Sequence, residues 1–185
     1  MRVLTAIFAG TLLSVSACNS ERTDQMPAEN DLGSNVNIPS EVAPTASQAF
    51  VDAAAASDKF EIESSKLAEN AGASEKIKSF AKQMISGHTA STAKLKLTLT
   101  EVNPPTVPND ALDAEQQATI DSLRGKSGAD FDAAYAAAQA QAHQKTLDVL
   151  KAYAASGDNP TLVAFAKDMI PVVTAHLNMA NGLAR

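Results

Sequence analysis

The side chains best able to do chemistry in this chain are its three histidines and one acid placed among apolar residues. The histidines are His88, His143 and His176, and each falls on a different predicted helix. Glu61 lies on the apolar stripe of a further predicted helix. Counting from the hairpin turns puts all four near mid-height of their helices, because each residue adds about 1.5 Å of rise. Imidazoles and a carboxylate that converge inside a bundle are suitable ligands for a transition metal.

The spacing favours one metal ion over two. Di-iron carboxylate bundles carry Glu-x-x-His on two helices and a further Glu on each of the others. Here the residues three positions before the histidines are Ile85, Ala140 and Val173. A ferroxidase-type di-iron site is therefore not expected. The sequence predicts instead a candidate site for a single zinc, iron or copper ion, made by the three histidines and the glutamate.

The same side chains leave other interpretations open. Buried imidazoles can form a polar cluster, bonded to Glu61, Tyr135, Thr146 or one another, that only fixes the alignment of the helices. Met84 and Met179 lie about one turn from histidines, and soft sulfur would suit copper(I). Methionine at helical spacing, however, usually fills core space.

Apolar residues recur at three- and four-residue spacing through most of the chain, which predicts an all-α domain. The long helices are expected at about 50–71, 74–99, 130–155 and 161–183, with a short one at about 113–124. Gly72 and the run 157–160 predict tight turns, whereas the prolines within 103–109 predict a long connection. Two hairpins joined by a long connection that contains a short helix describe a four-helix bundle with a crossover.

The predicted buried faces of the third and fourth long helices can be checked residue by residue. The third long helix is predicted to bury Phe131, Tyr135, Ala138, Ala142, Thr146, Val149, Leu150 and Tyr153, with His143 at the border. The fourth is predicted to bury Leu162, Phe165, Ala166, Met169, Val172, Val173, His176, Met179 and Leu183. The stretch 94–99 in the second helix also alternates as a strand would, although the helix is the expected structure there.

Cys18 is the single cysteine and follows a short apolar run that begins after Arg2. The run is too short to span a bilayer and is typical of a secretory signal. The residues Val15-Ser16-Ala17-Cys18 look like a bacterial lipobox. By that resemblance residues 1–17 are a signal peptide and Cys18 becomes lipidated, while Asn19 would favour the outer membrane, facing the periplasm.

Residues 18–46 are rich in Ser, Asn and Pro and carry five acids and one base. Such a composition cannot bury enough apolar surface to fold, so a tether is expected. Residues 47–185 then form one helical bundle domain. The chain has a net charge of −6 and no basic stripe, which argues against nucleic-acid binding. The expected partners are the membrane, through Cys18, and either an envelope protein or a second copy.

Four groups of residues, one on each predicted long helix, come in the order found in a known family. They are Glu61-Ile62-Glu63 with Lys66-Leu67-Ala68, Phe80-Ala81-Lys82-Gln83-Met84 with His88-Thr89, Phe131-Asp132 with Tyr135 and His143, and Phe165-Ala166 with Pro171 and His176-Leu177. By these motifs the segment from Ser47 to Leu183 resembles the DUF4142 family. The resemblance implies an exported bacterial protein with a ferritin-like bundle, and it implies little about activity. Gly87 departs from the family, which commonly has an acid there.

Motifs of nucleophilic catalysis are absent from the sequence, which has no Gly-x-Ser-x-Gly elbow, phosphate-binding loop or second cysteine. No catalytic residue is therefore predicted, and an enzyme is not the expected class. We expect a lipid-anchored envelope protein of unknown biochemical activity, whose buried His/Glu cluster is a candidate site for one transition metal. The alternative is a structural or partner-binding envelope or stress lipoprotein whose histidines only fix helix packing.

Overall fold

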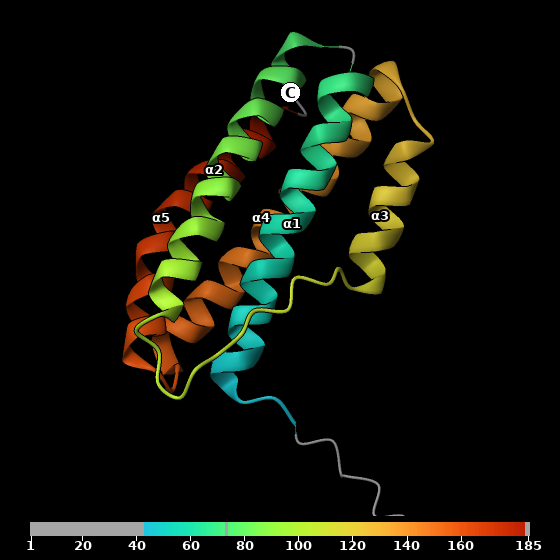
Figure 1. Cartoon of the computed structure of the whole chain (residues 1–185). Helices are drawn as coiled ribbons and strands as arrows, with labels where there is room; N and C mark the ends of the chain where they lie inside the picture. The colour runs from blue at the N-terminus through green and yellow to red at the C-terminus, as the bar shows by residue number, and fades with distance from the viewer. Residues whose placement is uncertain (1–42, 73, 184–185) are drawn as a thin grey trace, which may run out of the picture. The chain divides into compact units, whose positions relative to one another are not determined.

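The computed structural model describes residues 43–72 and 74–183, and these form five α-helices (Figure 1). They are α1 (Ala46–Ala71), α2 (Glu75–Leu99), α3 (Ala114–Arg124), α4 (Gly128–Ser156) and α5 (Pro160–Leu183). The predicted all-α class is confirmed, with four long helices and one short helix in the expected order. The predicted signal peptide, Cys18 and residues 18–42 of the predicted tether lie outside the described residues.

The four long helices form a bundle, and α3 lies on its outside. The hairpin partners α1 and α2 pack together, as do α4 and α5, and the contacts of α1 with α4 and of α2 with α5 close the ring. The connection after α2 crosses one end of the bundle beside α1 and reaches α3, which packs against α1 and α4 (Figure 1). This is the predicted crossover with its short helix.

Local sequence explains where the helices begin and end. Ser74 accepts a hydrogen bond from the backbone N–H of Ile77 and caps α2. Asp113 caps α3 in a capping box with Gln116. Gly72 ends α1 at a close approach, since a Cβ there would lie 2.7 Å from the backbone oxygen of Ala68.

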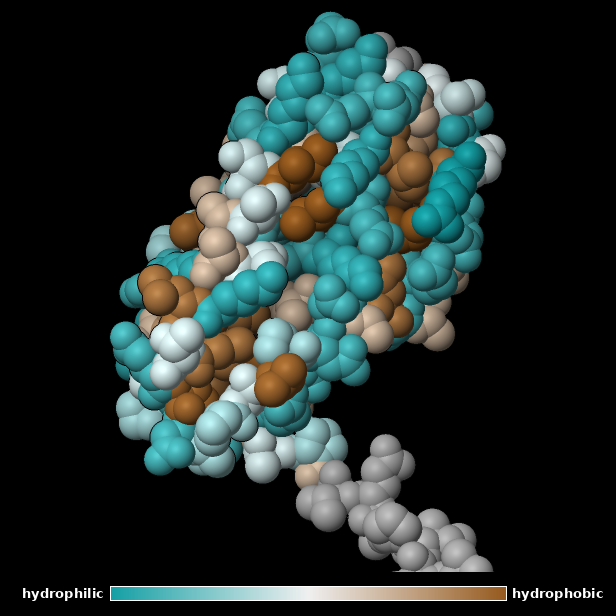
Figure 2. All heavy atoms as spheres, viewed as in Figure 1, coloured by the Kyte–Doolittle hydropathy of each residue, from teal (hydrophilic) through white to brown (hydrophobic). Residues whose placement is uncertain are grey.

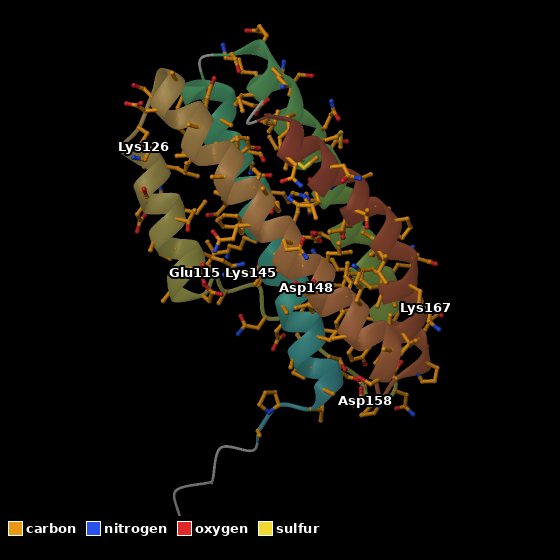
Figure 3. All side chains as sticks on the ribbon, turned by 180° about the vertical axis from the view of Figure 1, so that it is seen from behind. Glu115, Lys126, Lys145, Asp148, Asp158 and Lys167 are labelled. Atoms are coloured by element: carbon orange, nitrogen blue, oxygen red, sulfur yellow. The ribbon has the colours of Figure 1, made fainter. Side chains whose placement is uncertain are left out.

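Hydrogen bonds and charges hold the crossover and α3 against the bundle. The carboxylate of Asp52 on α1 accepts from the backbone N–H of Asn109, at 2.8 Å. Glu115 on α3 forms an ion pair of 2.6 Å with Lys145 on α4, and the two lie together in Figure 3. A cleft of about 400 Å³ lies between α1, α3 and α4. Its lining includes several alanines of α1 and α4.

The core is divided by a polar layer. One apolar cluster includes Phe50, Leu95, Leu150 and Phe165, and the other includes Ala68, Phe80, Tyr135 and Ala180. On every long helix the residues of the two clusters lie on either side of buried polar positions. These positions are Asp58, Glu61, His88, Gln139, His143 and the partly buried His176. A band of polar side chains thus crosses the bundle between two apolar halves.

The buried face of α4 differs from the predicted stripe. It comprises Phe131, Tyr135, Ala136, Gln139, His143, Leu147, Leu150 and Tyr153. Ala138, Ala142, Thr146 and Val149 instead line the cleft beside α3. Because α4 is rich in alanine and contacts α3 as well as the core, its pattern has two weak apolar faces. On α5, Val172 and Met179 were predicted to be buried, but they are 41% and 37% exposed.

Polar residues cover most of the face seen in Figure 2, where hydrophobic residues appear in separate patches. Scattered surface apolar residues of this kind are normal for a folded domain. Within the described part of the chain, no helix combines the length and the apolar character needed to cross a membrane.

Candidate metal centre

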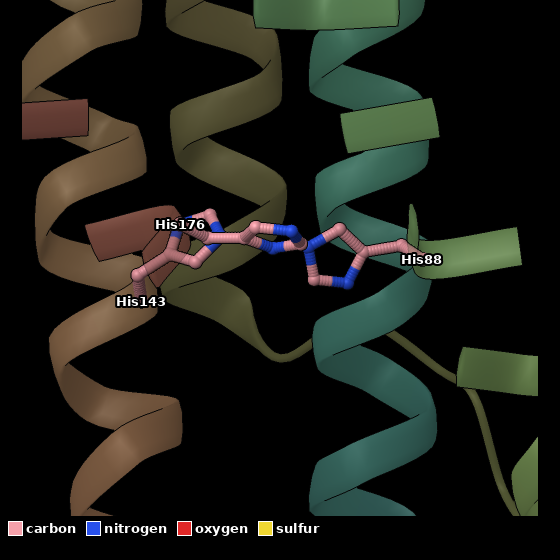
Figure 4. Close-up of side chains that lie close together, drawn as sticks. All are labelled: His88, His143 and His176. Carbon is pink, nitrogen blue, oxygen red and sulfur yellow. The ribbon is translucent and has the colours of Figure 1, made fainter. Parts of the chain in front are cut away.

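Three imidazole rings converge inside the bundle from three different helices. His88 comes from α2, His143 from α4 and His176 from α5 (Figure 4). Their ring centroids form a nearly equilateral triangle with sides of 5.5, 5.4 and 5.5 Å. One ligand atom from each ring lies within 4.8 Å of the other two. The structure therefore brings together the three histidines singled out from the sequence.

Hydrogen bonds to the outer nitrogens orient two of the rings. The Nδ1 of His143 lies 2.8 Å from the backbone oxygen of Gln139, one turn earlier in α4. A carbonyl oxygen only accepts, so Nδ1 carries the proton and Nε2 of the neutral ring keeps its lone pair. The Nδ1 of His88 is held in the same way, 2.8 Å from a carboxylate oxygen of Asp58. In both rings the nitrogen left available for a ligand is Nε2.

His176 completes the triangle from α5 and is less buried than the other two. Its Nδ1 is buried and has no hydrogen-bond partner. Its ring passes close to the backbone of α2 at Gly87, where a Cβ would lie 3.0 Å from Cε1 of His176. The absence of a side chain at Gly87 therefore makes room for the ring. A side chain at this position would require the ring to shift by a few tenths of an ångström.

Asp58 is a member of the site that the sequence reasoning missed. It is 6% exposed, and besides His88 it accepts a hydrogen bond of 2.9 Å from Thr92 of α2. A signal was present, because Asp58 lies three residues before Glu61 and helical residues three apart share a face. A carboxylate hydrogen-bonded to the outer nitrogen of a histidine is the usual second-shell partner of a metal ligand, and it raises the basicity of that ligand.

Glu61 is buried in the same layer but stands apart from the three-histidine group. It is 1% exposed, and one of its oxygens lies 3.5 Å from Nδ1 of His143, the nitrogen that already bonds to Gln139. Neither carboxylate oxygen makes a hydrogen bond of good geometry. Burial raises the pKa of Glu61 to about 7, although the nearby His88 and an interaction with the side chain of Gln139 act in the opposite direction. The structure thus places Glu61 beside the outer edge of one imidazole.

The three imidazoles differ in the direction of their pKa shifts. Burial lowers the pKa of His143 to about 3 and that of His176 to about 4, and charge on His88 adds to both shifts. Burial would also lower the pKa of His88, but the hydrogen bond to Asp58 and the charges of Glu61 and Asp58 outweigh it and raise the pKa. At neutral pH, His143 and His176 are therefore uncharged, which is the form that binds metals.

Unsatisfied polar atoms are concentrated at this cluster. Among the described residues, the buried side-chain nitrogens and oxygens without a hydrogen-bond partner all belong to Glu61, His88, Gln139, His143 and His176. For the two buried histidines the orphaned atom is Nε2, and for His176 it is Nδ1. Buried polar groups in folded proteins are nearly always paired, so orphaned atoms need an explanation.

The side chains expected to satisfy a purely structural cluster are engaged elsewhere. The hydroxyl of Tyr135 is hydrogen-bonded to Ser65, and that of Thr146 donates to the backbone oxygen of Ala142 while pairing with Ser57. The two methionines near the histidines differ in burial. Met84 is fully buried in an apolar cluster, and Met179 is partly exposed.

A small cavity adjoins two of the histidines. It has a volume of about 20 Å³, and its lining includes His88, His176, Gly87, Ser91 and Val172. Gly87 and Ser91 are partly exposed and Val172 is exposed, so the cavity reaches the surface between α2 and α5. Its volume suffices for about one water-sized molecule.

Comparison with family models supports the resemblance noted from the sequence motifs. The model DUF4142, described as a domain of unknown function, matches residues 36–183. Neither the curated proteins nor the solved structures gave a match to the chain. Because the matched segment covers most of the 185 residues, this protein belongs to the DUF4142 family.

Proposed function

We propose that this protein binds a single transition-metal ion through Nε2 of His88, Nε2 of His143 and Nδ1 of His176. The observation that carries the proposal is that these three nitrogens are buried, lack partners and belong to rings that face one another. A metal ion is the ligand that satisfies three inward lone pairs at once. Imidazole donors suit zinc, iron, copper and nickel.

The geometry is close to that of a bound site. Metal–nitrogen bonds of about 2.0–2.1 Å in a tetrahedral site put the nitrogens about 3.4 Å apart, whereas the ligand atoms here lie within 4.8 Å of one another. Metal binding thus requires the rings to move inward by about an ångström. Each ring comes from a different helix, so small rotamer changes can supply this movement.

The negative charge of the buried polar layer also favours the binding of a divalent cation. Asp58 and Glu61 are two buried carboxylates that balance two positive charges when both are ionised. Without a cation, a buried carboxylate is costly, and the raised pKa of Glu61 reflects that cost. In the bound state Asp58 stabilises His88 as a ligand, and Glu61 compensates charge beside His143.

We further propose that the domain acts at the bacterial envelope as an outer-membrane lipoprotein facing the periplasm. The lipobox-like run that ends in Cys18 supports this location. Two or more acyl chains give stable anchoring without a membrane-spanning helix. The tether would hold the metal-binding bundle clear of the lipid surface.

Metal titration of the purified protein tests the function. Calorimetry with zinc, cobalt and copper should give one ion per chain, with a dissociation constant below about 1 μM. Each of the changes His88→Gln, His143→Gln and His176→Gln should weaken binding at least 100-fold, because each removes one of three ligands. Ser65→Ala is a matched control, since Ser65 is a buried polar residue of α1 that bonds to Tyr135 and to none of the histidines.

The outcomes separate metal binding from the structural alternative. If wild-type protein binds none of the ions tighter than micromolar, the metal proposal is wrong. Loss of thermal stability in the three histidine variants without any metal binding in the wild type would assign the cluster to helix alignment.

A further inference from the structure

We propose that the metal held by the three histidines keeps one coordination position directed into the cavity between α2 and α5, where it takes a small oxygen or nitrogen donor from solution. This inference rests on the proposed function and adds to it the class of exogenous ligand. Three protein ligands with an open position distinguish reactive metal sites from structural ones, which are closed by four.

Three protein donors lie close enough together to bind one ion. Within the described residues, the only group of three or more His, Cys, Asp or Glu side chains this close together contains the three histidines alone. Glu61 lies outside it, beside the outer nitrogen of His143. A tetrahedral ion bound by these residues therefore has one position that the protein leaves to another ligand.

The open position would face the cavity of about 20 Å³, which is lined by His88 and His176 but not by His143. Its other lining side chains are mostly apolar, including Ala54, Phe165 and Val173, and the polar ones are Asp58, Ser91 and Thr146. Its size fits water, hydroxide or the end of a small linear anion.

The cavity is accessible from solvent. Gly87, Ser91 and Val172 line the cavity where α2 and α5 meet at the surface, and Val172 is 41% exposed. A ligand can therefore enter at this seam without unfolding the bundle. Bulky, strongly hydrated or flat ligands are excluded by the narrow volume.

The test is azide binding to the full-length protein loaded with cobalt(II), whose visible absorption reports changes in coordination. Azide should shift the spectrum in a saturable way. Ser91→Leu fills the cavity and should weaken azide at least tenfold while leaving cobalt affinity within twofold. Ser86→Leu is the matched control, because it makes the same change at an exposed position of α2 outside the cavity, and it should behave as wild type.

A second variant guards against misfolding of the first. Val172→Phe starts from an exposed side chain at the mouth and should slow azide association without repacking the core. Cobalt binding without any azide shift would overturn the open position and leave the proposed function standing. An azide shift that neither variant changes would overturn its assignment to this cavity. Failure to bind cobalt or zinc at all would instead refute the proposed function.

Discussion

Two carboxylates on one face of α1 do different things at the candidate metal centre. Asp58 has a hydrogen-bond partner on each oxygen, His88 and Thr92, whereas Glu61 makes no hydrogen bond of good geometry. An unpaired buried polar group costs about 1–3 kcal/mol, so Glu61 is poorly explained as a stabilising residue. Asp58 is well explained as a brace between α1 and α2, and its effect on a metal ion has to be measured separately from that brace.

Asp58→Asn should weaken zinc binding about 10- to 100-fold, the range expected when a second-shell carboxylate is lost. Asparagine can still accept the hydrogen bond from His88, but it removes the negative charge that makes the imidazole more basic. Competition with a chromophoric chelator measures the affinity. Asp52→Asn is the matched control on the same helix, because Asp52 holds the crossover and touches no histidine. Equal zinc affinity in both variants would mean that Asp58 is only a brace.

At the scale of the element, the sequence predicted helix positions better than it predicted helix faces. Gly72 was expected to form a turn, and α1 ends beside it at Ala71. The alternating stretch 94–99 is helical, because α2 gains more by continuing along its packed face than by isolated extended pairing. The predicted buried face of α4 was wrong at several positions. Its many alanines differ little in hydrophobicity between the side that faces the core and the side that faces the cleft. The burial of Asp58 was not predicted, because a charged residue is rarely buried unless it is paired. Its partner, His88, lies 30 residues away in the sequence.

The two hairpins are also tied at one end of the bundle, away from the metal centre. The carboxylate of Asp158, in the turn between α4 and α5, accepts hydrogen bonds from Ser47 of α1 and Tyr153 of α4, at 2.7 and 2.8 Å. These bonds hold the pKa of Asp158 below its ordinary value. A depressed carboxyl pKa stabilises the native state at every pH above the unfolded value, and the contribution is lost as pH falls through the native value.

Asp158→Asn should therefore lower the melting temperature at pH 7, and the difference from wild type should shrink as the pH is lowered below about 4. Circular dichroism melts at pH 7, 5, 4 and 3 measure the difference. Asp148→Asn, an exposed acid of α4 bonded only to Gln144 in the described contacts, is the control and should change the melting temperature little at any pH. A difference that stays constant from pH 7 to pH 3 would show that charge on Asp158 contributes nothing.

At the scale of the whole molecule, a polar layer crosses a bundle that has only one cysteine and so no disulfide within the chain. The two apolar halves on either side of the layer supply the packing that outweighs the cost of burying charge. The sequence could predict that three histidines meet, because each was on a different helix at similar height. It could not predict which nitrogens face inward, because that depends on bonds to Gln139 and Asp58 formed only after folding.

Anchoring and metal binding should be separable, because Cys18 and the histidines belong to different parts of the chain. In cells fed labelled palmitate, the wild type should incorporate label and fractionate with the outer membrane. Cys18→Ser should lose both properties while still binding one metal ion per chain, since no thiol is needed at the three-histidine site. His88→Gln should do the reverse, retaining label and losing the metal. If the wild-type protein incorporates no label, the proposed lipid anchor is wrong. If Cys18→Ser no longer binds the metal, anchoring and metal binding depend on each other.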